Sequence, residues 1–143
     1  MMTFDDRQIH WSQLPGFDNF SYSILSIDQA NQLVDVLFHF RAHDPIVLHR
    51  HCALNHTFVV RGEHHLYHAS GELKEVRPTG SYTISPPDTT PHRECGDDGT
   101  VVLFSIRGTG DVMYEILDDQ QNLLATLGMA EFASLYEANR QAL

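Results

Sequence analysis

The chain has 143 residues, with 9 Lys and Arg against 19 Asp and Glu, so its formal net charge is −10 when its 10 His are neutral. This length is typical of one domain, and a hydrophobic content of 42% is typical of a folded globular protein. The acidic balance argues against nucleic-acid binding, which needs clustered Lys and Arg, and no apolar run approaches the roughly 18–20 residues that cross a bilayer.

The elements that the sequence predicts are mostly short strands with turn signals between them, which favours an all-β sandwich or barrel. In the clearest strand, Val34, Val36, Phe38 and Phe40 alternate with polar residues, as on a half-buried strand. A proline-rich turn at 86–88 ends a later strand, because proline cannot donate to a ladder. The predicted strands are 21–27, 33–41, 45–51, 57–60, 64–68, 80–85 and 100–107, followed by a hairpin of 111–117 and 123–127.

Only the end of the chain has the periodicity of a helix. Between residues 129 and 142, Met129, Phe132, Ala133 and Tyr136 recur at spacings of three and four. We therefore expect a single all-β domain over residues 1–143 with one short C-terminal α-helix.

The sequence His49-Arg50-His51 is the sharpest local signal. Residues i and i+2 of a strand share a face, so His49 and His51 are expected to present two imidazoles side by side. Neutral imidazole binds Fe, Zn, Cu and Ni. His92 follows the proline-rich turn, which can bring a third imidazole from a distant strand to the pair. Three protein ligands are typical of a catalytic metal site.

These residues resemble the two motifs of the cupin superfamily. The first motif, G-x5-H-x-H-x3,4-E-x6-G, aligns with His43, His49, His51, Asn55 and Gly62. The second, G-x5-P-x-G-x2-H-x3-N, aligns with Gly80, Pro87, Thr89, His92 and Gly96, with one extra residue before Pro87. The three histidines and two glycines match, whereas the glutamate, the other two glycines and the final asparagine do not. The resemblance implies a double-stranded β-helix, the jelly-roll or RmlC-like cupin barrel, over about residues 20–127.

A three-histidine site without the glutamate resembles one cupin subfamily, the acetylacetone-cleaving and 2,4'-dihydroxyacetophenone dioxygenases. This resemblance implies a non-haem Fe(II) dioxygenase that uses O2 to cleave a C–C bond of a small chelating diketone or hydroxyketone. Zn, Ni or Mn are alternative metals. Independently of the resemblance, three neutral imidazoles leave the full +2 charge on Fe(II), which favours a substrate that chelates as a monoanion.

Three residues are candidates for a fourth ligand, or for a group that orients the histidines through a hydrogen bond. Asn55 occupies the glutamate position of the first motif, and a one-residue bulge would turn the neighbouring His56 inward. Glu94 lies two residues after His92 and would share its strand face. It would thereby supply the carboxylate that the first motif lacks at Asn55.

Four further residues are candidates for the pocket wall. His64 and Tyr67 belong to a second histidine-rich strand, and Phe58 and Phe104 lie on strands whose inner face is both core and pocket wall.

A second class of function is a regulatory or small-molecule-binding cupin without turnover, like the zinc-binding domain of certain anti-sigma factors. A metal-dependent isomerase, another oxygenase on the same barrel and a metal-free cupin are further alternatives, because a fold does not by itself determine a function. The expected partners are a small substrate, O2 and a second copy in a homodimer. Two Cys and the lack of an apolar N-terminal stretch favour a cytoplasmic setting.

Overall fold

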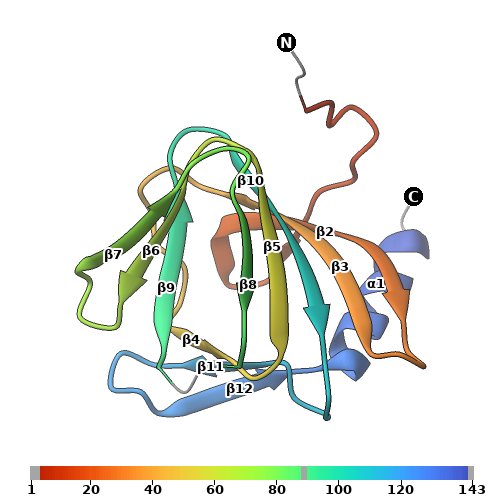
Figure 1. Ribbon diagram of the computed structural model, residues 1–143. Coiled ribbons are helices and arrows are strands. Elements are labelled where there is room, and N and C mark those ends of the chain that lie inside the picture. The colour runs from red at the N-terminus through yellow and green to blue at the C-terminus, as the bar shows by residue number, and fades with distance from the viewer. Residues whose placement is uncertain (1–3, 88–89, 142–143) are drawn as a thin grey trace.

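Two six-stranded sheets face each other in the computed structural model, which describes residues 4–87 and 90–141 (Figure 1). In spatial order, the first sheet consists of β1 (Ser12–Leu14), β2 (Phe17–Asp28), β3 (Leu33–Phe40), β10 (Thr100–Arg107), β5 (Leu54–Arg61) and β8 (Tyr82–Ser85). The second consists of β12 (Leu123–Leu127), β11 (Tyr114–Leu117), β4 (His49–His51), β9 (His92–Gly96), β6 (His64–His68) and β7 (Leu73–Arg77). The paired strands within each sheet are antiparallel.

The helix α1 (Met129–Gln141) follows β12 and packs against β2 and β12 (Figure 1). The expected fold class, an all-β jelly-roll sandwich with one short C-terminal helix, is therefore confirmed. The predicted helix end at Ala142 lies outside the described residues, as do Asp88 and Thr89 of the proline-rich turn. No helix within the described part of the chain is long and apolar enough to cross a membrane.

The strand order places segments that are distant in sequence side by side. Strand β10 lies between β3 and β5, and β9 lies between β4 and β6. The second arrangement matters for function, because the β4–β9 pairing sets His49 directly opposite His92.

Several predicted strands have different bounds in the structure. The strand expected at 45–51 is reduced to β4, because Pro45 has no N–H to donate and the segment before it turns through His43, whose φ is +54°. Strands β1 and β7 were not predicted, because they are edge strands without an alternating apolar pattern. Strand β9 begins at His92, where the proline-rich turn was expected to re-enter the sheet.

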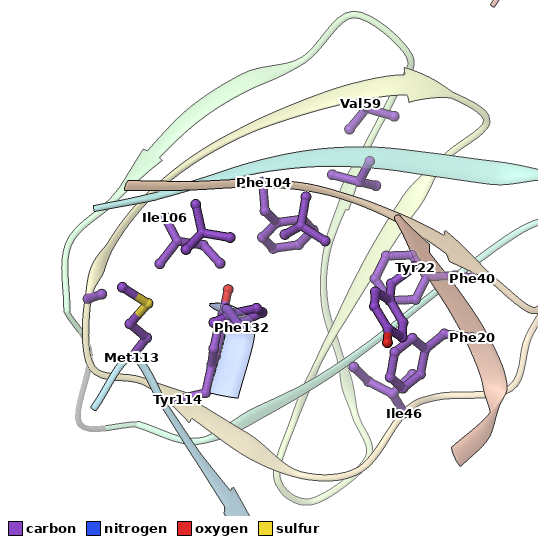
Figure 2. Packing of buried hydrophobic residues seen from close by; sticks show 14 residues of the cluster. Phe20, Tyr22, Phe40, Ile46, Val59, Phe104, Ile106, Met113, Tyr114 and Phe132 are labelled. Carbon is purple, nitrogen blue, oxygen red and sulfur yellow. The ribbon is translucent and has the colours of Figure 1, made fainter. Parts of the chain in front are cut away.

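The core fills the space between the sheets. Val34, Val36 and Phe40 of β3 are at most 2% exposed, as their alternation in the sequence predicts. The labelled side chains in Figure 2, such as Phe104 and Phe132, come from both sheets and α1 and point into this interior. Aromatic side chains thus form much of the wall around the interior in which a binding site can lie.

Replacing Gly128 with alanine should destabilise the junction between β12 and α1. A Cβ at Gly128 would lie 1.7 Å from the backbone oxygen of Asp111, which cannot yield without moving the backbone that leads into β11. We expect a loss of about 2–3 kcal/mol, or roughly 5–10 °C in thermal midpoint, by calorimetry. Gly110→Ala is the matched control, because no atom lies within 4 Å of its Cβ position. Equal midpoints for the two variants would contradict the prediction.

Candidate metal centre

Four buried side chains meet between the sheets: His49 and His51 from β4, and His92 and Glu94 from β9. Each pair is separated by one residue and therefore shares a strand face. The ring centroids of His49 and His51 each lie 4.6 Å from that of His92. One ligand atom from each of the four residues lies within 4.8 Å of all the others. We call these four residues the cluster.

The donor set fits a metal ion. The Nε2 atoms of His51 and His92 are buried and have no hydrogen-bond partner among the described residues. Such orphaned polar atoms are costly unless a ligand satisfies them. His49 Nδ1 lies 2.9 Å from the carbonyl oxygen of Val47, to which it donates, so its Nε2 faces the cluster. Imidazoles with a carboxylate suit Fe, Mn, Ni or Zn.

Glu94 supplies the negative charge of the cluster. Its Oε2 accepts a hydrogen bond from His49 Nε2 at 2.8 Å, and its Oε1 accepts one from His64 Nε2 at 2.9 Å. Burial raises the pKa of the Glu94 carboxyl, but the hydrogen bonds from His49 and His64, with the His92 ring 3.8 Å away, outweigh it and hold this pKa well below its usual range. The carboxylate is therefore ionised.

The two histidines of β4 differ in their electrostatic environment. Burial lowers the pKa of His49, but its hydrogen bond to Glu94 and the charge of that carboxylate raise it above the usual value overall. A proton therefore bridges His49 and Glu94, and a metal ion would displace it. Burial holds the pKa of His51 well below its usual range despite the Glu94 charge. His51 is thus neutral, the form that binds a metal.

Asn55 lies behind the cluster rather than in it. Its Oδ1 accepts a hydrogen bond from Tyr114 Oη at 2.8 Å, and its Nδ2 donates to the carbonyl oxygen of Ala53 at 3.0 Å. The ring of Tyr114 lies 4.9 Å from that of His51. Asn55 therefore holds Tyr114 against a cluster histidine. The sequence did not reveal Tyr114, because its position opposite His51 depends on the β4–β11 pairing.

Whether the remaining candidate residues of β5 and β6 point toward the cluster depends on which face of its strand each one occupies. Asn55, Thr57 and Val59 of β5 are buried, so His56 and Phe58 lie on the opposite face. His56 contacts the Tyr82 hydroxyl there and does not join the cluster. Phe58 is 39% exposed and lines no cavity described below. The inward bulge considered for His56 does not occur.

On β6, His64 faces inward and Tyr67 faces outward. His64 is fully buried, stacks parallel to Phe40 at 5.6 Å, and binds Glu94 from behind rather than lining a cavity. The Tyr67 hydroxyl lies 3.4 Å from Cys95 Sγ, and this contact raises the pKa of Tyr67 to about 12. Tyr67 is therefore placed away from the cluster, whereas the ring centroid of Phe104 lies 6.5 Å from that of His51.

Two cavities reach the cluster, and we name them by their walls. The apolar cavity, of about 210 Å³, has mainly aromatic and aliphatic walls and meets the cluster at His49 and Glu94. Its other lining residues include Phe17, Phe20, Phe38, Tyr114, Ile116 and Leu135.

The polar cavity, of about 280 Å³, meets the cluster at His51, His92 and Glu94. Its other lining residues include Thr57, Lys74, Arg77, Ser85 and Pro87. Phe104 lines both cavities, so the cluster and this ring separate them. A ligand at the cluster can therefore contact an apolar space on one side and a polar space on the other.

Comparison with known proteins identifies the relatives of this architecture. The family model described as the ChrR cupin-like domain matches residues 1–110. No curated protein matches the sequence. An RmlC-like cupin from Ralstonia eutropha is 18% identical, with a TM-score of 0.75 over 100% of this chain and 90% of that chain.

Two other similar structures carry the name of an enzyme. An acetylacetone dioxygenase from Acinetobacter johnsonii is 14% identical, with a TM-score of 0.70 over 97% of this chain and 91% of that chain. A suspected acetylacetone dioxygenase from Methylibium petroleiphilum is 13% identical, with a TM-score of 0.72 over 95% and 94% of the two chains. At these identities the likeness shows a common fold.

Proposed function

This chain belongs to the ChrR cupin-like family, and on that premise we propose that it is a metal-dependent enzyme of the cupin fold. More specifically, we propose a non-haem Fe(II) dioxygenase that uses O2 to cleave a C–C bond of a small chelating diketone or hydroxyketone. The observation that carries this proposal is the buried cluster of three histidines and one glutamate, two of which, His49 and Glu94, line an apolar cavity.

In this proposal His49, His51, His92 and Glu94 hold the metal. Iron, when bound, would supply a Lewis acid for two substrate oxygens and a redox partner for O2. Three neutral imidazoles and one carboxylate leave a +1 charge on an Fe(II) site, rather than the +2 expected for three histidines alone. An enolate monoanion would then make the buried site neutral, which avoids the cost of an uncompensated charge.

The remaining residues of the site position these groups and exclude water. The carbonyl oxygen of Val47 fixes the tautomer of His49, and His64 fixes Glu94 from behind. The apolar cavity offers a water-poor space for the part of the substrate that does not chelate. The bond that breaks would join the activated carbon between the two carbonyl groups to one of the carbonyl carbons, with one atom of O2 entering the acid product and the other entering the carbonyl product.

Oxygen consumption tests this function directly. Protein purified without oxygen and loaded with about one Fe(II) per chain should consume O2 when a β-diketone such as acetylacetone is added, with one O2 used per diketone cleaved. The matched sample is the same protein loaded with Zn, which has no redox chemistry and should consume none. Iron-loaded protein that consumes no O2 with any β-diketone or hydroxyketone would contradict the proposal.

A second candidate is a metal-binding regulatory or small-molecule-binding cupin without turnover, because the cluster could hold a metal without any reaction taking place there. Metal identity separates the two functions. Zinc that copurifies at one per chain and is not replaced by iron would support the regulatory function, whereas iron with O2 uptake would support the enzyme.

We also propose a homodimer in a reducing, cytoplasmic setting. Cys52 and Cys95 are both free thiols in the structure, which fits such a compartment. Sedimentation of the purified protein measures the oligomeric state.

A further inference from the structure

The polar cavity contains an unusual concentration of positive charge for this chain. Lys74 and Arg77, both on β7, line it, and Lys74 is the only lysine in a sequence with a net charge of −10. A cavity that leads to a metal cluster and carries two cations is suited to an anion.

A β-bulge places both cations at the same cavity. Lys74 and Arg77 are three residues apart, so regular alternation would direct them to opposite faces of β7. The pairing with β6 shifts register here: Leu66 faces Glu75 and Tyr67 faces Leu73, which leaves Lys74 as the unpaired extra residue. Bulges of this kind re-aim a side chain. The bulge therefore turns Lys74 toward the cavity that Arg77 also lines.

The two cations differ in their availability to a ligand. Arg77 is mostly buried, donates to Glu75 at 3.1 Å and lies 3.4 Å from Thr57 Oγ1, so its charge is already balanced. Lys74 is exposed and forms no ion pair with any residue that the structure describes. Its charge is available for an incoming anion.

The charge of the cluster indicates how many negative charges a ligand can carry. A divalent metal with Glu94 and three neutral imidazoles has a net charge of +1, which one enolate neutralises. A ligand with an additional carboxylate would leave a charge of −1, and Lys74 can balance it. The two unpartnered nitrogens of the cluster, on His51 and His92, belong to residues that line the polar cavity, so a chelating ligand and Lys74 share one space.

We propose that the ligand of this site is a 1,3-dicarbonyl compound that carries a carboxylate, with its carboxylate at Lys74 in the polar cavity and its acyl end in the apolar cavity. This inference rests on the metal site of the proposed function but not on turnover. Lys74 thereby determines specificity for the acid over a neutral diketone.

Acetylpyruvate and its methyl ester test the inference, because they have the same dicarbonyl skeleton and differ in one negative charge. Their binding is measured by calorimetry on the full chain loaded with Zn, so that no turnover occurs. We expect the acid to bind wild-type protein roughly tenfold more tightly than the ester, as for a hydrogen bond between charged groups. Lys74→Gln should remove this preference and leave ester binding within about twofold, while Lys74→Arg should retain it.

Arg107→Gln is the control, because it removes an exposed cation that lines neither cavity. Zn stoichiometry and near-UV circular dichroism confirm that each variant is folded and loaded. The inference is overturned if acid and ester bind wild-type protein equally, if neither binds, or if Arg107→Gln lowers the preference as much as Lys74→Gln does. Acid preference without O2 uptake by the iron form would refute the dioxygenase and uphold this inference.

Discussion

Replacing His51 with alanine is expected to reduce the metal content of the protein from about one ion per chain to nearly none. His51 is buried and neutral, its Nε2 has no partner in the described chain, and two other cluster imidazoles lie within 5.3 Å of its ring. Loss of one of a few ligands lowers metal affinity steeply, because the others cannot close around the ion. Elemental analysis of dialysed protein measures the change.

The same variant should also lose the stabilisation that a metal provides. An ion present at about 1,000 times its Kd stabilises the folded state by about 4 kcal/mol, so a chelator should lower the wild-type thermal midpoint by roughly 10 °C. The midpoint of His51→Ala should not respond to the chelator. His56→Ala is the control, because this histidine lies on the outer face of β5 beside Tyr82. If His51→Ala retains a full equivalent of metal, the cluster is not the binding site.

The sequence was sufficient to anticipate the meeting of three histidines because two local rules apply to them. Strand alternation places His49 and His51 on one face, and the proline-rich turn before His92 starts a new strand. The structure brings these residues together through the β4–β9 pairing. That they bind a metal remains a proposal.

The placement of the carboxylate required three-dimensional information. The family pattern directed attention to Asn55, whose side chain instead bonds Tyr114. Glu94 was one of three candidates for a fourth ligand, because it shares a strand face with His92. Only the position of β9 between β4 and β6 distinguishes Glu94 from the other two candidates. Its second oxygen also reaches His64, a contact between strands that no local spacing encodes.

Inner and outer faces were the least predictable property. Phe58 and His56 face outward because β5 begins its inward alternation at Asn55, and one residue of difference in register reverses every side chain. The bulge at Lys74 breaks alternation altogether, so the sequence pattern of β7 did not indicate a cavity residue. Register and bulges depend on cross-strand pairing, which is set by the whole fold.

Replacing Glu94 with glutamine should weaken metal binding by more than the roughly 10–100-fold that is typical when a group outside the coordination sphere is lost. The amide has nearly the same shape but no negative charge, so it binds a divalent cation poorly, and it cannot balance the charge of the metal in a buried site. Competition with a chelator of known affinity measures the change. Glu115→Gln is the matched control, because Glu115 pairs with Arg50 at 3.0 Å and lies outside the cluster.

The size of this effect decides between two chemical forms of the centre. A loss well above 100-fold means that Glu94 binds the metal and that an Fe(II) site carries a +1 charge, which one enolate neutralises. A loss of tenfold or less, with about one ion still bound per chain, means that Glu94 only orients His49 through their 2.8 Å hydrogen bond. The metal would then be held by three neutral histidines only, as the alignment of Asn55 with the motif glutamate suggests. Such a centre has a net charge of +2, and binding of one enolate would lower it to +1.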